Sequence, residues 1–142
     1  MNNRQRYWIP ILLLTALLGS CAGGTSGSVI GSKESCSSSA GSGICEGTFN
    51  KLKGTYGKDI EDESVFSGDA IDVEVRASVE SGPIRISVES PDSEVTFIEI
   101  SSGNSGTLLG VASGEFDGFE VVFEALEGEA EDITYQITYQ VR

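Results

Sequence analysis

Apolar and polar residues alternate along much of the chain after residue 46. The clearest run extends from Ile71 to Val79, in which every second residue is apolar. A period of two is typical of a β-strand with one buried face, because successive side chains point to opposite sides of the sheet. Ser81-Gly82-Pro83 then supplies a turn, and Ile84 to Val88 resumes the alternation, so the two runs together predict a β-hairpin.

Five further runs of the same kind predict additional strands, and no segment between them has a sustained helical period. These strands are predicted over Phe49 to Tyr56, Glu94 to Ile100, Thr107 to Ala112, Phe119 to Ala125 and Ile133 to Val141. The last two are separated by a charged segment, Glu127 to Glu131, which is expected to form a turn. About seven short strands separated by turns predict an all-β domain, an antiparallel β-sandwich, over residues 47–142.

The first twenty residues have a different organisation. Arg4 and Arg6 precede an apolar run from Tyr7 to Leu18, and small residues follow that run. The run is shorter than the ~20 residues that a membrane-spanning helix needs. Residues 1–20 are therefore predicted to be a secretory signal peptide that is removed on export.

The end of this leader, Leu18-Gly19-Ser20-Cys21, resembles the lipobox of bacterial lipoproteins. In that family the leader is cut immediately before the cysteine, which is then acylated. The resemblance implies a lipidated Cys21 that anchors the protein to a membrane. Ala22 in place of Asp implies, by resemblance to enterobacterial lipoproteins, the outer membrane of a diderm cell, and otherwise the outer face of the cytoplasmic membrane. Ordinary secretory cleavage after Ala22 is the alternative.

The segment that follows Cys21 is rich in small residues. Residues 22–46 contain six Gly and eight Ser without an apolar period, so we expect residues 21–46 to be a lipidated cysteine and a flexible linker. Cys36 and Cys45 interrupt this linker. In an exported protein the default expectation is a disulfide between them, and a covalent link to another protein is the alternative. Two cysteines alone leave a metal site incomplete.

Charge and composition exclude several functions. The chain from Cys21 onward keeps 7 basic and 22 acidic residues, a formal charge of −15, because Arg4 and Arg6 lie in the leader. Such a surface repels nucleic acid, and solubility or adaptation to high salt accounts for it. The chain has no His, which excludes Ser–His–Asp and Cys–His catalysis and most zinc sites.

Carboxylates are the only plentiful reactive groups. Asp59, Glu61, Asp62 and Glu63 form a cluster that is a weak candidate for Ca²⁺, although no Asp-x-Asp-x-Asp-Gly loop is present and solvated turns are the alternative. A hydrolase would need two carboxylates at a fixed separation, which proximity in the sequence does not establish.

The last predicted strand has two distinct faces. Tyr135 and Tyr139 lie on its apolar side and are expected to face the core, with a sugar-stacking platform as the alternative. The opposite side carries a polar, uncharged ladder of Thr134, Gln136, Thr138 and Gln140. This ladder is either an ordinary solvent-exposed face or a surface that recognises a partner.

The layout of residues 47–142 resembles the small sandwich domains of extracellular lipoproteins and, more loosely, the GOLD-type sandwich. The openings Gly47-Thr48-Phe49 and Gly54-Thr55-Tyr56 support that resemblance. It implies a cargo- or partner-binding module and carries no functional residue across. The predicted anchor, the linker, the β-domain and the lack of a catalytic set lead us to expect a non-enzymatic envelope lipoprotein without a cofactor, whose β-sandwich is a binding or structural module. Its expected partner is an envelope or extracellular protein. The alternative is a Ca²⁺-dependent ligand- or glycan-binding module.

Intact mass of the protein extracted from membranes tests the predicted processing. The expected product begins at Cys21 and carries acyl chains, because the lipobox resemblance places cleavage immediately before that residue. Cys21→Ser is expected to abolish both acylation and membrane association. An unacylated product that begins at Gly23 would show ordinary secretory cleavage instead.

Overall fold

The computed structural model describes residues 26–142, so the predicted leader and Cys21 lie outside the described residues. The described residues form seven antiparallel strands: β1 (Ser28–Ser39), β2 (Ser42–Glu61), β3 (Ala70–Ser81), β4 (Ile84–Glu89), β5 (Val95–Ile100), β6 (Asn104–Ser113) and β7 (Gly118–Val141). The predicted all-β class with an antiparallel, sandwich-like fold is confirmed. A search of the described residues found no helix with the length and hydropathy needed to span a membrane.

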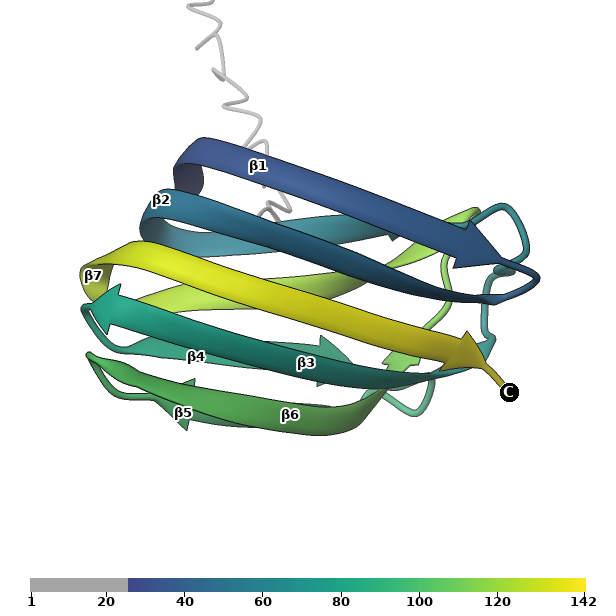
Figure 1. Cartoon of the computed structure of the whole chain (residues 1–142). Helices are drawn as coiled ribbons and strands as arrows, with labels where there is room; N and C mark the ends of the chain where they lie inside the picture. The colour runs from purple at the N-terminus through teal and green to yellow at the C-terminus, as the bar shows by residue number, and fades with distance from the viewer. Residues whose placement is uncertain (1–25) are drawn as a thin grey trace, which may run out of the picture.

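The strands form two layers that are continuous with one another (Figure 1). The front layer has the strand order β1-β2-β7-β3-β6 and uses residues 42–53 of β2 and 129–141 of β7. The back layer contains residues 55–61 of β2, residues 118–125 of β7, β4 and β5. Because β2 and β7 run through both layers, they connect the two faces of the sandwich.

The long strand β7 corrects the prediction of two separate strands with a charged turn between them. Pairing with β2 changes from Lys53↔Glu129 to Thr55↔Glu124, so β7 has additional residues at the point where it crosses between layers. Gly128 adopts a φ of +87°, a left-handed conformation that glycine adopts without a steric penalty. The charged residues therefore form the outside of a bend rather than the end of a strand.

The inward side chains of both layers form one core. Phe49 of the front layer lies edge-on to Phe123 of the back layer, with ring centroids 5.4 Å apart. Tyr135 packs against both rings, with centroid distances of 5.0 Å to Phe49 and 5.3 Å to Phe123. These three side chains are at most 3% exposed, so the two layers are held together by a buried aromatic cluster.

The prediction of a flexible linker is wrong for residues 28–46. Ser28–Ser39 forms β1 and pairs with β2, from Ser28↔Lys53 to Ser39↔Ser42, so the sandwich begins before residue 47. Nearly all of β1 is exposed, which explains why its sequence lacks an apolar period. Backbone pairing, which does not depend on side-chain type, stabilises it instead.

A disulfide reinforces this first strand. Cys36 of β1 and Cys45 of β2 are directly opposite in the register, and the structure joins them. Cys45 is 1% exposed and belongs to the core, so the bond connects the exposed edge strand to the interior. The default expectation for this pair therefore agrees with the structure.

Phe123→Ala is expected to destabilise the fold by about 3–5 kcal/mol, because it leaves a cavity between two packed layers. Urea unfolding monitored by circular dichroism would measure the change. Leu109→Ala is the matched control, since Leu109 is 69% exposed on β6 and its truncation is expected to cost about 0.5 kcal/mol or less. Equal effects of the two substitutions would contradict the location of the core.

Candidate functional site

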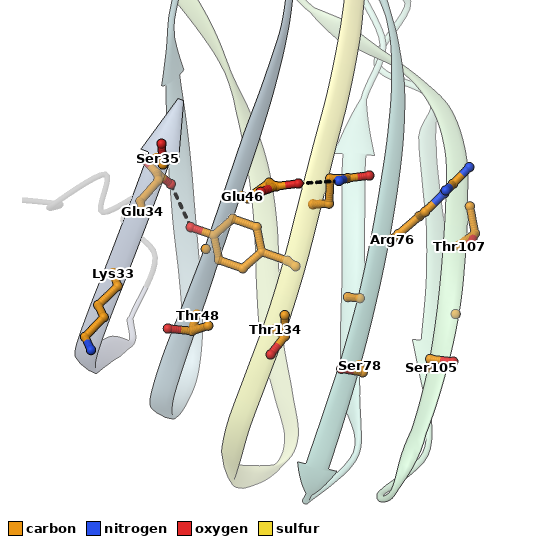
Figure 2. Close-up of a pocket in the computed structure, with 15 residues that line it drawn as sticks. Lys33, Glu34, Ser35, Glu46, Thr48, Arg76, Ser78, Ser105, Thr107 and Thr134 are labelled. Atoms are coloured by element: carbon orange, nitrogen blue, oxygen red, sulfur yellow. Dashed lines mark hydrogen bonds between the residues drawn. The ribbon is translucent and has the colours of Figure 1, made fainter. Parts of the chain in front are cut away.

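A broad groove of about 1000 Å³ crosses the outer face of the front layer. All five strands of that layer contribute to it, and Figure 2 shows the side chains that they present. The residues that line it are Lys33, Glu34, Ser35, Glu46, Gly47, Thr48, Arg76, Ala77, Ser78, Ser105, Gly106, Thr107, Thr134, Tyr135 and Gln136.

The strand register builds this groove from two rows of outward side chains. One row runs across the layer through Ser35, Glu46, Gln136, Arg76 and Thr107, and each of these is opposite the next in the pairing. The residues of a row come from five different strands, yet pairing holds neighbouring Cβ atoms about 4.5–5.5 Å apart.

The second row runs parallel to the first and is separated from it by two residues on each strand. It consists of Lys33, Thr48, Thr134, Ser78 and Ser105. Because residues two apart on a strand share a face, the two rows lie side by side on the same outer surface. The lining therefore combines several hydroxyl groups with a few charges.

The groove contains both signs of charge. Gln136 donates a hydrogen bond from Nε2 to the Glu46 carboxylate at 2.5 Å, which orients both side chains across the layer (Figure 2). The Arg76 guanidinium forms an ion pair with Glu74 on the same strand. Lys33 adds a second cation, an ammonium group, at the edge of the groove. Hydrogen-bond donors and acceptors are thus both present on this surface.

A partly buried hydrogen bond supports the groove from below. The Tyr135 hydroxyl donates to the Glu34 carboxylate at 2.6 Å and connects β7 to β1 across Gly47 of β2 (Figure 2). Burial, and then the Glu34 carboxylate, raises the pKa of Tyr135 above its usual value. A Cβ on Gly47 would lie 2.4 Å from the Tyr135 hydroxyl oxygen, so this position requires glycine. The tyrosine therefore holds the edge strand in place.

The groove presents groups that can bind a polar ligand. Its hydroxyl and amide groups can hydrogen-bond to a polar ligand, and its floor is a regular sheet, which keeps these groups in place before binding. The charged side chains near them can orient a ligand by its own charges. The chemistry that this surface supports is recognition of an extended polar molecule.

The four weak Ca²⁺ candidates lie at one end of the sandwich, away from the groove. Asp59, Glu61, Asp62 and Glu63 line a second concavity of about 940 Å³ that contains Glu115 and Asp117 as well. Within residues 26–142, no group of three or more His, Cys, Asp or Glu side chains is arranged to hold a metal ion. The structure therefore brings these four residues together in one concavity.

Asp62 has a structural role in that cluster. It is 8% exposed, and its carboxylate accepts hydrogen bonds from the backbone amide of Ser64 at 2.9 Å and from the Tyr139 hydroxyl at 2.8 Å. Burial raises the pKa of Asp62, but the hydrogen bonds from Ser64 and Tyr139 outweigh that effect, so the pKa lies below its usual value. Burial, and then Asp62, raises the pKa of Tyr139 to about 12.

The fold shows which way each face of the last predicted strand points. Tyr135 and Tyr139 are each 3% exposed, so they belong to the core and do not form a sugar-stacking platform. Thr134 and Gln136 from the polar ladder line the groove, whereas Thr138 and Gln140 do not. The contributions of β1, β3 and β6 to the groove were not predicted, because their polar residues become neighbours of Thr134 and Gln136 only after the five strands have paired.

No family model and no curated protein matches this sequence. Similar solved structures include peruvianin-I, a cysteine peptidase from Thevetia peruviana latex, at 12% identity and a TM-score of 0.34, covering 71% of this chain and 51% of that one. The chain thus spans about half the length of that peptidase.

Two other solved structures are matched over more of their length. A CBM4 structure has 12% identity and a TM-score of 0.40, with 80% of each chain covered. A structure of Bacillus endospore appendages, described as disulfide-linked pili, has 15% identity and a TM-score of 0.41, covering 87% of this chain and 96% of that one. Similarity at this level supports no statement about function.

Tyr139→Phe is expected to lower the free energy of unfolding at neutral pH by about 1–3 kcal/mol, because it removes a donor from a buried carboxylate. The pKa of Asp62 is lower in the folded protein than its usual value of 3.8, so the Asp62 carboxylate stabilises the fold above pH 3.8. This stabilisation is lost as the pH falls below 3.8. The difference in unfolding free energy between variant and wild type, measured by urea unfolding, should therefore become smaller below pH 3.8. A constant difference across this range would contradict the role of Asp62.

Proposed function

We propose that this protein is a lipid-anchored envelope lipoprotein whose β-sandwich is a non-enzymatic binding module. The observation that carries the proposal is the groove across the front layer, which combines polar groups from five paired strands into one surface. The partner is an extended polar segment of another envelope or extracellular protein.

The chemistry of the groove supports a polypeptide partner. Hydroxyls and an amide suit the side chains and exposed main-chain groups of an extended segment. Lys33, Arg76 and Glu46 provide charges of both signs, which can set the direction in which such a segment binds. The regular sheet beneath these groups lowers the entropic cost of ordering them on binding.

The position of β1 supports the anchoring part of the proposal. Cys21 is seven residues before Ser28, so a fully extended connection reaches at most about 25 Å. This bound is tighter than a linker over residues 22–46 would give, because β1 belongs to the sandwich. A lipid on Cys21 therefore keeps the groove close to the membrane, in the outer membrane of a diderm cell or on the outer face of the cytoplasmic membrane.

A glycan is the second candidate for the groove, because a hydroxyl-rich surface suits sugar hydroxyls as well. Within the described residues, the one aromatic side chain in the lining is Tyr135, whose ring is in the core. A sugar would consequently bind by hydrogen bonds alone, without the stacking that aromatic rings supply. This difference favours the protein partner.

Thr134→Trp is expected to block the groove and to reduce partner capture at least about tenfold, a loss of roughly 1.4 kcal/mol of binding free energy. Photo-crosslinking and pull-down from intact cells, with quantification by mass spectrometry, would measure the loss. Thr138→Trp is the matched control, since it makes the same change on the same face of β7 outside the groove lining.

Both variants are expected to melt within a few degrees of the wild type, because both positions are solvent-exposed. Equal capture by the two variants would refute the groove as the binding site. A glycan array probed with the full chain distinguishes the second candidate, which requires sugar binding that Thr134→Trp abolishes and Thr138→Trp preserves.

A further inference from the structure

Two aromatic side chains project from one end of the sandwich. Phe66 lies in the loop between β2 and β3 and is 63% exposed, and Phe116 lies in the loop between β6 and β7 and is 80% exposed. Isolated apolar residues on a surface need no explanation, but two phenylalanines on adjoining loops make an apolar contact surface of a kind that is common in protein recognition.

The two loops are held rigidly against each other. Gly68 donates a backbone hydrogen bond to Gly114 at 2.9 Å, and Gly114 donates to Asp69 at 2.7 Å. Asp117 donates from its backbone to the Val65 carbonyl at 3.3 Å. Val65 itself is fully buried and fixes the first loop to the core. The loops that present both rings are therefore ordered before any partner binds, which lowers the entropic cost of association.

The surroundings of the rings are acidic. Residues 59–69 and 115–120, which we call the acidic end, contain eight Asp and Glu residues and no Lys or Arg. Lys58 and Arg142 border these segments, but each forms an ion pair with a carboxylate outside the acidic end. Lys58 lies 3.0 Å from Glu34, and Arg142 lies 2.7 Å from Asp72.

The carboxylates of the acidic end also act on one another. Burial, and then the neighbouring carboxylates of Asp59 and Glu115, raises the pKa of Glu120. The part of this shift that comes from Asp59 and Glu115 is repulsion between negative charges that lie close together. A cationic partner would relieve this repulsion on binding.

We propose that the acidic end is a docking surface for a second protein, whose binding face has an apolar recess for Phe66 and Phe116 surrounded by Lys and Arg side chains. The rings supply the buried apolar area at the centre, and the carboxylates around them select a basic partner. This arrangement of an apolar centre with a charged rim is common in protein interfaces.

The charge of the acidic end argues for a protein rather than a membrane. Anionic lipid headgroups would be repelled by the same carboxylates. The proposed anchor at Cys21 places the membrane near Ser28, at the start of β1. The acidic end lies at the opposite end of β1, about 36 Å away along a strand of twelve residues. The docking surface shares no lining residue with the groove, so the two sites can be tested separately.

The test uses the full chain reconstituted in neutral phosphatidylcholine vesicles and three fluorescent peptides, composed of Lys and Leu, Lys and Ser, or Glu and Leu. Binding is measured by fluorescence anisotropy after subtraction of binding to protein-free vesicles. The Lys/Leu peptide is expected to bind at least about tenfold more tightly than the other two, because only that peptide offers both cations and apolar side chains. Its affinity should also decrease as salt is added.

Variants at the acidic end separate the two contributions. F66S/F116S is expected to lose at least about tenfold in affinity for the Lys/Leu peptide. E63Q/E115Q removes two of the eight carboxylates and is expected to lose affinity and part of the salt dependence. The single variant F116S serves if the double variant does not fold. The controls are L109S, which removes an exposed apolar side chain elsewhere, and E80Q/E127Q, which removes two exposed carboxylates outside the acidic end.

Several results would overturn the proposal. These are equal affinity of F66S/F116S and wild type, equal binding of the Lys/Ser and Lys/Leu peptides, and peptide binding that Thr134→Trp abolishes. Attachment of the protein to anionic vesicles through Phe66 and Phe116 would identify a membrane instead of a protein. Retained peptide binding in Thr134→Trp supports the acidic end even if the groove has no partner, so failure of one site does not imply failure of the other.

Discussion

The structure depends on the antiparallel pairing of β2 with β7, which continues through both layers of the sandwich. Each strand bends at the same level, so the hydrogen-bonded pair contributes to the front and the back layer in turn. Phe49, Phe123 and Tyr135 occupy the space between the layers and hold them together. This arrangement supplies a rigid sheet for the groove and a fixed attachment for the loops of the acidic end.

Tyrosine hydroxyls connect that core to the two surfaces. Tyr135 donates to Glu34 beneath the groove, and Tyr139 donates to Asp62 at the acidic end. Each ring is buried while its hydroxyl reaches a carboxylate near the surface, so one strand positions both sites. The hydrogen bond from Tyr135 is most important for the edge strand β1, because the side chains of β1 bury little surface. A tyrosine–carboxylate hydrogen bond and the Cys36–Cys45 disulfide hold it to the sheet.

The groove and the acidic end differ in what they offer a partner. The groove presents many polar groups on a regular sheet and suits an extended segment. The acidic end presents two aromatic rings within a field of carboxylates and suits a folded, basic surface. If the protein is anchored through Cys21, its two surfaces would connect partners at different distances from the membrane.

The sequence by itself determined the all-β class and five of the predicted strands, because strict alternation over runs such as Ile71 to Val79 requires one buried face. It also indicated a core position for Tyr135 and an outward one for Thr134. Tertiary structure decided the rest. Ser28–Ser39 became a strand through backbone pairing at an edge, where side chains carry no apolar signal. The groove could not be predicted, because its rows join residues from five strands that are adjacent only after the sheet has formed.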